Sequence, residues 1–155
     1  MPVKRLTDFL DSHKIKYVKI SHSLAYTAQE IAASAHVSGK ELAKTVIVKL
    51  DGSMAMAVLP ALRRIDPDRL RRASGANQIA FATEGEFKSR FPECDVGAMP
   101  PFGNLYDMAV YVDASLAEDE EIVFNAGSHT ELVRMNWADF KRLVEPKIAS
   151  FVTPR

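Results

Sequence analysis

The sequence predicts an α+β fold in a single domain. The chain has 155 residues, a length that normally forms one domain. Several strand-like segments follow one another through tight turns, and the helical segments stand apart from them, which favours α+β over regular βαβ winding. No repeat, low-complexity segment or shift in composition marks a second unit, so we expect residues 1–155 to fold as one domain.

The N-terminal part of the chain is expected to contain two helices and one strand. Apolar residues recur at helical spacing over residues 4–13, which predicts an amphipathic helix. Residues 16–20 alternate in polarity and are predicted to form a strand. The segment Thr27-Ala28-Gln29-Glu30 has the spacing of a capping box, so a second helix is expected to begin there and to end near Gly39.

A β-hairpin and a short helix are expected next. Residues 45–50 and 53–59 are strand-like, and the Asp51-Gly52 dipeptide between them is a strong signal for a two-residue hairpin turn. Asp66-Pro67-Asp68 predicts the start of a helix that runs to about Ala73 and stops at Gly75. A short strand over residues 78–82 follows.

The C-terminal half is predicted to alternate between short helices and strands. Thr83-Glu84-Gly85-Glu86 again has capping-box spacing, and Phe87 and Phe91 form an i, i+4 pair. Strands are expected over residues 108–112, 121–124 and 131–135. Asn136 can cap a final helix, and Pro146 follows its end.

Composition narrows the possible classes of function. The chain has 20 Lys and Arg and 20 Asp and Glu, so its formal net charge is zero. This balance argues against a protein that coats nucleic acid through many phosphate contacts, but it permits binding of one RNA end. The single Cys94 excludes an internal disulfide and suits a reducing cytosol. No apolar run approaches 18 residues and the start of the chain lacks a signal-peptide core, so we expect a cytoplasmic protein without a membrane span.

The most informative stretch is a loop that runs from Cys94 to Gly103. Pro100 and Pro101 fix φ and supply no N–H, while Gly97 and Gly103 permit backbone angles and close approaches that a Cβ would block. Such a loop is stiff and can present backbone N–H groups to a carbonyl or an oxyanion. The plainer alternative is a rigid surface turn.

Three short motifs in this chain together resemble the YbaK/prolyl-tRNA synthetase editing-domain family. They are Lys44-Thr45 near the start of an apolar strand, Gly97-Ala98-Met99-Pro100, and Ala126-Gly127 after a later strand. An early Ser21-His22-Ser23 segment ahead of Thr27 also resembles the N-terminal part of the family. The resemblance covers nearly the whole chain, and it implies a large curved mixed β-sheet with helices packed around it.

The resemblance implies a free-standing trans-editing deacylase that hydrolyses the ester of a mischarged tRNA by water attack, without a cofactor. Lys44 and Gly97 take the catalytic roles. The residues implied to bind substrate are Thr27, Ala98, Met99, Pro100, Phe102, Gly103, Asn125, Ala126, Gly127, Ser128 and His129. Met99 is bulkier than the residue many family members carry there, so the amino acid stays open among small ones such as Ala, Ser or Thr.

The implied partner is the 3′ acceptor end of a tRNA, bound weakly and by its end only. An aminoacyl-tRNA synthetase is a further partner to test. The protein is expected to be a monomer and to have no contact with membranes.

Each of these residues also has a plainer interpretation. Lys44 can be a surface lysine, as most lysines are. Asn125 to His129 can be a hairpin turn, and neighbouring strand residues point to opposite faces, so Ser128 and His129 are not expected to form a catalytic dyad. The four histidines have no metal-ligand spacing, so no metal is expected.

Two other clusters leave alternatives open. Five arginines lie within residues 63–72 and can contact an acceptor stem, or they can form a solvated helix balanced by Asp66 and Asp68. Cys94 can be a nucleophile, although a free cysteine is often a small buried hydrophobe. The competing functions are therefore a binding module of the same fold without turnover and, less favoured, a thiol hydrolase that uses Cys94.

Overall fold

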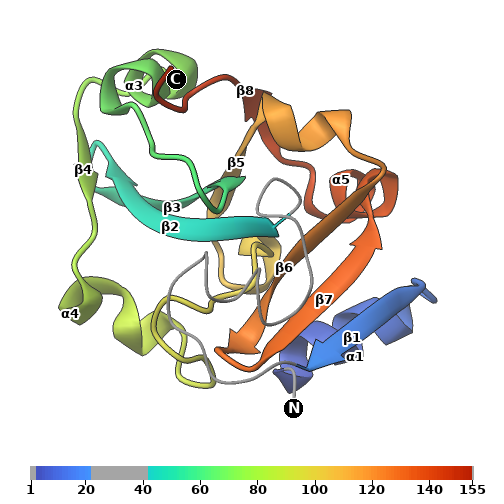
Figure 1. Ribbon diagram of the computed structural model, residues 1–155. Coiled ribbons are helices and arrows are strands. Elements are labelled where there is room, and N and C mark those ends of the chain that lie inside the picture. Colours follow the sequence, from blue (N-terminus) through green and yellow to red (C-terminus); the bar gives the residue numbers. More distant parts are fainter. Residues whose placement is uncertain (1–2, 22–41, 155) are drawn as a thin grey trace.

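The computed structural model describes residues 3–21 and 42–154, and its strands form one strongly curled sheet (Figure 1). The helix expected from Thr27 to Gly39 lies outside the described residues. The described helices and strands are α1 (Lys4–Ser12), β1 (Tyr17–Ser21), β2 (Leu42–Leu50), β3 (Ser53–Pro60), α3 (Pro67–Ser74), β4 (Ile79–Phe81), α4 (Glu84–Phe87), β5 (Ala109–Asp113), β6 (Glu121–Ser128), β7 (Glu131–Asn136), α5 (Trp137–Val144) and β8 (Lys147–Ala149). Three 3₁₀ turns, η1 (Lys88–Arg90), η2 (Gly103–Leu105) and η3 (Ala114–Glu118), connect them.

The sheet is mixed, as the resemblance implied. Its strand order is β1-β7-β6-β2-β3-β5-β8, and β4 pairs separately with β2. The pairs β2–β6, β3–β5 and β5–β8 are parallel, and the remaining pairs are antiparallel. The helices pack around this sheet, which confirms the predicted α+β class (Figure 1).

One edge of β2 is shared by two different strands. β6 pairs with Leu42 and Ala43 at the start of β2, whereas β4 pairs with Val48 to Leu50 at its end. Within the described chain, residues 44–46 therefore pair with β3 on one side only. We call this opening between β6 and β4 the fork.

The local signals in the sequence produce the predicted helix ends. The Asp66 side chain accepts hydrogen bonds from the backbone N–H groups of Asp68 and Arg69, and Gly75 ends α3 in the left-handed region at φ 76°. Thr83 and Glu86 form both bonds of a capping box at the start of α4. The side chain of Asn136 caps α5.

The hairpin between β2 and β3 is also confirmed. Asp51 and Gly52 both have positive φ, 50° and 86°, as a tight turn of this class requires. The Phe87 and Phe91 rings contact at 6.3 Å between centroids, although α4 ends at Phe87 and η1 carries the chain onward.

Two expectations about the C-terminal half were wrong. β6 does not end at residue 124 but continues through Ser128, past an irregularity between Asn125 and Ser128. The short strand β8 was not predicted, because three residues after Pro146 carry too little pattern to be recognised.

The sheet separates two apolar clusters. On one face, Phe102 packs against the rings of Phe9, Phe124 and Phe140. On the other face, a smaller cluster joins Val48, Leu59, Leu70, Tyr111 and Phe151. None of the helices in the described ranges has both the length and the apolar character needed to span a bilayer.

Candidate functional site

The Gly/Pro loop and the end of β6 are joined by hydrogen bonds. The N–H of Gly127 donates to the carbonyl oxygen of Ala98 (2.9 Å), and the N–H of Asp95 donates to the carbonyl oxygen of Gly127 (2.7 Å). The N–H of His129 donates to the Asp95 carboxylate (3.2 Å). Two of the motifs that the sequence places about 30 residues apart therefore meet in the structure.

The side chain of His129, in the turn between β6 and β7, also forms a hydrogen bond with this loop. Its Nε2 lies 2.8 Å from the carbonyl oxygen of Val96, which can only accept, so this nitrogen carries the proton. Ser128 is directed elsewhere, since its hydroxyl lies 3.3 Å from that of Thr130. The expectation that Ser128 and His129 do not form a dyad agrees with these contacts.

Gly97 has a backbone conformation that glycine favours. Its φ is 87°, it is exposed, and a Cβ built there would lie 3.6 Å from Cε1 of His129. The N–H of Ala98 is already bonded to the carbonyl oxygen of Asp95 at 3.0 Å. In the part of the chain that the structure describes, the N–H groups of Gly97 and Met99 have no hydrogen-bond acceptor, so both are available as donors beside Ala98.

The rest of the loop is buried. The side chain of Phe102 has 0% exposure, and a Cβ on Gly103 would lie 2.2 Å from the carbonyl oxygen of Met108. Ala98 and Pro100 are buried as well. Packing against the core thus accounts for Phe102 and Gly103 without a ligand, and it holds the loop rigid below Gly97.

Ala126 and Gly127 lie within β6 rather than in a turn, which corrects the expectation from sequence. The turn falls at residues 129–130 instead. The carbonyl oxygen of Ala126 accepts from the N–H of Val3 (2.8 Å), and a Cβ on Gly127 would lie 2.9 Å from the Cβ of Val3. Gly127, at φ 100°, therefore allows the segment before α1 to pack against β6.

Lys44 lies in the fork. It is half-buried on β2, one residue beyond the last pair that β2 makes with β6, Ala43 with Phe124. Continuing that parallel register places Asn125 beside Lys44 and on the same face. Asn125 is 7% exposed, and its Oδ1 is buried without a hydrogen-bond partner among the described residues.

The surroundings of Lys44 disfavour the charged form of its side chain. Burial lowers the pKa of its ammonium group, and the nearby positive charge of Arg64 lowers the pKa further. Neither Lys44 nor Arg64 forms an ion pair within the described ranges. An anion or an ester oxygen that enters the fork would relieve this repulsion, and a hydroxyl or amino group beside it could donate to the Oδ1 of Asn125.

A cavity of about 390 Å³ opens on the loop next to α4 and η1. Its walls are formed mainly by apolar side chains, namely Phe87, Phe91, Pro92, Cys94, Val96 and Met99, together with Gly85, Lys88 and Ser89. Met99 is only 3% exposed, so its side chain belongs to the core as well as to the wall of this cavity.

Cys94 is not activated as a nucleophile. Burial raises the pKa of its thiol, and its Sγ lies 3.7 Å from the hydroxyl of Tyr106. Because the thiolate is the reactive form, a raised pKa disfavours the thiol-hydrolase alternative. The described residues contain no group of three or more His, Cys, Asp or Glu side chains arranged to hold a metal ion.

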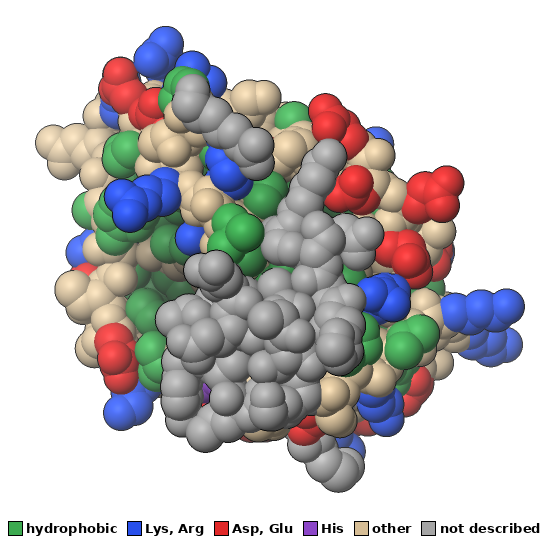
Figure 2. Space-filling view, viewed as in Figure 1, with side chains coloured by type: hydrophobic (Ala, Val, Ile, Leu, Met, Phe, Trp, Pro, Cys, Tyr) green, Lys and Arg blue, Asp and Glu red, His purple; other side chains and the backbone are tan. Residues whose placement is uncertain are grey.

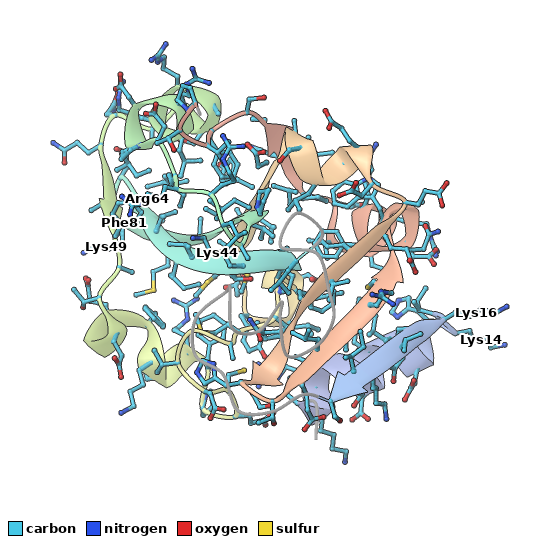
Figure 3. All side chains as sticks on the ribbon, in the orientation of Figure 1. Lys14, Lys16, Lys44, Lys49, Arg64 and Phe81 are labelled. Carbon is cyan, nitrogen blue, oxygen red and sulfur yellow. The ribbon has the colours of Figure 1, made fainter. Side chains whose placement is uncertain are left out.

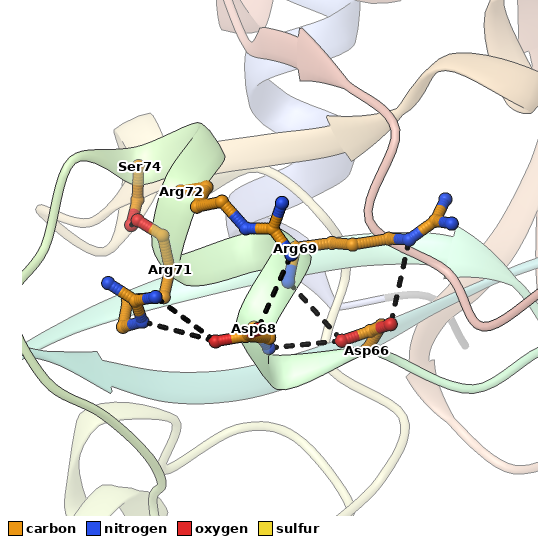
Figure 4. Close-up of polar contacts among 6 residues, drawn as sticks. All are labelled: Asp66, Asp68, Arg69, Arg71, Arg72 and Ser74. Carbon is orange, nitrogen blue, oxygen red and sulfur yellow. Dashed lines mark hydrogen bonds and ion pairs between the residues drawn. The ribbon is translucent and has the colours of Figure 1, made fainter.

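The arginines of α3 are largely neutralised by the helix's own acids (Figure 4). Asp66 pairs with Arg69, and Asp68 pairs with both Arg71 and Arg72. Figure 2 shows basic and acidic side chains interspersed over the described surface on one side of the molecule. The solvated-helix interpretation of α3 therefore agrees with the contacts, whereas Arg64, which precedes the helix, has no carboxylate partner among the described residues.

The structure thus joins the Gly97–Met99 loop to Gly127 and His129 at the end of β6, and the strand register places Lys44 beside Asn125 of the same strand, while Thr27 lies outside the described residues. Sequence reasoning missed the fork and the position of Arg64 beside Lys44. Nothing local in the sequence signals either one, because both depend on which strands pair with β2.

Comparisons with known proteins agree on one family. The sequence pattern described as the aminoacyl-tRNA editing domain matches residues 22–143. The multifunctional Ser/Thr-tRNA deacylase ProXp-y of Escherichia coli K12 is 24% identical over 153 residues, which cover 96% of this chain and 91% of that protein. A proline–tRNA ligase of Bacillus mycoides is 20% identical over 89 residues, covering 57% of this chain and 16% of the ligase.

Solved structures share the fold. The crystal structure of hypothetical protein APE2540 superposes with a TM-score of 0.86 at 18% identity, covering 97% of this chain and all of that one. A candidate trans-editing enzyme for prolyl tRNA synthetase superposes with a TM-score of 0.83 at 19% identity, covering 97% of this chain and 96% of that one.

Proposed function

The chain belongs to the family of aminoacyl-tRNA editing domains, and on that premise we propose that it is a free-standing deacylase for tRNA mischarged with a small amino acid. Serine and threonine are the first substrates to test, because the Escherichia coli relative is named for them. The relative is matched over 91% of its length, which supports a protein that acts without a synthetase body.

The observation that carries the proposal is the fork. On one face it places an ammonium group without an ion-pair partner among the described residues and the buried, unpartnered Oδ1 of Asn125, and the same strand β6 is hydrogen-bonded to a loop in which the N–H groups of Gly97 and Met99 are available. The ammonium group and the N–H donors can bind an ester and stabilise negative charge on its carbonyl oxygen, and the Asn125 Oδ1 can accept a hydrogen bond from the substrate. They include no activated side-chain nucleophile, which suits direct attack by water.

The reaction assigns a role to each group. A water oxygen attacks the ester carbonyl carbon, and the N–H groups of Gly97 and Met99 stabilise the oxyanion. The carbon–oxygen bond to the terminal ribose then breaks, the ribose oxygen takes up a proton, and the amino acid leaves. Lys44 holds the terminal nucleotide or the ester oxygen, and Asn125 accepts a hydrogen bond from the substrate through its Oδ1.

The remaining predicted substrate-binding residues take positioning roles. Ala98, Pro100, Phe102 and Gly103 keep the loop rigid, and Ala126 to His129 fasten it to β6. Met99 adds a bulky side chain to the wall of the adjacent cavity, so we propose that it limits which amino acid fits.

A deacylation panel tests this proposal. Purified protein is mixed with tRNAs that carry labelled serine, threonine, alanine or proline, and the release of amino acid is followed over time. Release of at least one small amino acid by the wild type, and a much slower release by a folded Lys44→Ala variant, is expected. If the wild type binds these tRNAs and releases nothing, the protein is a binding module and the hydrolase proposal is wrong.

A further inference from the structure

An exposed aromatic ring lies on the same face of the sheet as Lys44. Phe81 is 51% exposed although it is a large apolar side chain. It lies on β4 and pairs with Val48 of β2. Paired residues share a face, and residues two apart on a strand do too, so Phe81, Val48, Val46 and Lys44 are on one side of the sheet.

Two cations lie along this face. Lys44 and Arg64 are close enough for the Arg64 charge to lower the pKa of Lys44, and neither has a carboxylate partner in the described ranges. Lys49 is different, because its ammonium group is paired with Glu86. Figure 3 shows Lys44, Arg64 and Phe81 on the β2–β4 side of the molecule, with Lys14 and Lys16 on the opposite side.

Lys44 and Phe81 are separated by the length of a short single strand, which would run along the edge of β2 in the fork because Val48 itself is fully buried. Lys44 lies four positions before Val48, the partner of Phe81, along β2, which corresponds to about 13 Å. Stacked nucleotides advance by about 3.4 Å along one strand, so roughly three or four nucleotides fit this distance. An unpaired tRNA 3′ end that places its ester at Lys44 would therefore have a base within reach of Phe81.

We propose that Phe81 is a stacking platform for a base of the single-stranded tRNA 3′ end, and that Arg64 binds a phosphate of the same segment. The inference rests on the proposed function, because the ester has to lie at Lys44 for the strand to run toward β4. Aromatic rings and cations along one groove are the usual means by which proteins hold single-stranded RNA without reading much sequence.

The platform can be tested by binding alone, without turnover. The probe is a fluorescently labelled, uncharged RNA hairpin with an acceptor stem and a 3′ CCA end, and its affinity is measured by anisotropy. Phe81→Leu keeps an apolar side chain but removes the ring, so it should weaken binding by about 5- to 150-fold. Phe81→Tyr retains a π face and should bind nearly as the wild type does.

Matched controls come from the far side of the sheet. Val18 on β1 is also apolar and 54% exposed, so Val18→Ala tests the loss of an exposed apolar group elsewhere. Arg64→Gln should weaken binding and reduce its dependence on salt, whereas Lys16→Gln, which removes an exposed charge on the opposite side, should do neither.

A second probe that lacks the CCA end shows which part of the RNA is bound. The wild type should bind it more weakly, and Phe81→Leu should bind both probes alike. Wild-type affinity of a folded Phe81→Leu variant for the CCA probe would overturn the inference, as would equal affinity of the wild type for both probes. Binding that depends on Phe81 in a protein that hydrolyses no ester would leave the platform standing and refute only the hydrolase.

Discussion

Replacing Gly97 by valine tests whether the loop is a catalytic clamp or only a turn. At φ 87° the backbone is in a region that a β-branched residue rarely adopts. Strain of this kind costs about 1–3 kcal/mol. A Cβ at Gly97 would lie 3.6 Å from Cε1 of His129, which is an ordinary van der Waals contact. The variant should therefore fold, but with the N–H groups of the loop pointing in changed directions.

Gly75 provides a matched control at almost the same backbone angle. Its φ is 76°, nothing lies within 4 Å of a built Cβ, and it ends α3 away from the proposed site. Gly75→Val and Gly97→Val should therefore lose similar stability, with a fall in Tm of about 2–12 °C for a protein of this size.

The two variants should differ in activity. Misdirecting one oxyanion donor lowers kcat by about 10²- to 10³-fold, so Gly97→Val should lose at least 10²-fold in deacylation. Gly75→Val should keep nearly the wild-type rate. Both are measured at 25 °C on the substrate that the wild type cleaves best, with thermal melting to verify the fold. A folded Gly97→Val variant with wild-type activity would refute the assignment of the loop as the clamp.

Four further predictions concern charge and the thiol. Lys44→Ala should slow deacylation by about 10- to 150-fold while leaving Tm nearly unchanged, because a charge-assisted hydrogen bond contributes about 1.5–3 kcal/mol; an unchanged rate would exclude the lysine from the reaction. Cys94→Ala should keep its activity, since burial raises the thiol pKa; a dead but folded variant would revive the thiol mechanism. Hydrogen bonds from Lys49 and Thr83 lower the pKa of Glu86 from 4.5 to about 2, so this carboxylate stabilises the fold above pH 4.5 and the contribution disappears as pH falls through 2. When the free energy of unfolding is measured against pH, Glu86→Gln should therefore lose less stability between pH 4.5 and 2 than the wild type does. The affinity for tRNA should depend only weakly on salt, given a net charge of zero, and a slope that reports six or more released counterions would contradict binding by the end alone.

Local chemistry explains which parts of the fold were predictable from the sequence. The caps at Asp66, Thr83 and Asn136 and the hairpin at Asp51-Gly52 depend on side chains within a few residues of the backbone groups they satisfy. The motifs of the candidate site could be found in the same way, because proline restricts the backbone and glycine frees it wherever they stand.

The arrangement of the site could not be predicted in this way. The fork exists because β6 and β4 pair with different parts of one edge of β2, and such pairings are between residues far apart in the chain. The position of Asn125 beside Lys44 follows from that pairing, and the approach of Arg64 to Lys44 follows from the path of the chain after β3, whose Leu59 pairs with Lys44. Residues 102 and 103 were assigned to substrate binding by motif, whereas their burial gives them a packing role.

The parallel pairing of β2 with β6 also sets the order in which the protein can form during synthesis. Lys44 leaves the ribosome early, and its hairpin partner β3 follows at once, but β6 is made only after most of the chain. At 5–20 residues per second, roughly 4 to 17 s pass between the two. During this interval the start of β2, at Leu42 and Ala43, is an open strand edge, which invites pairing with other chains. The arrival of β6, which brings Asn125 beside Lys44, thus also covers the start of this edge, while residues 44–46 stay without a strand partner there among the described residues.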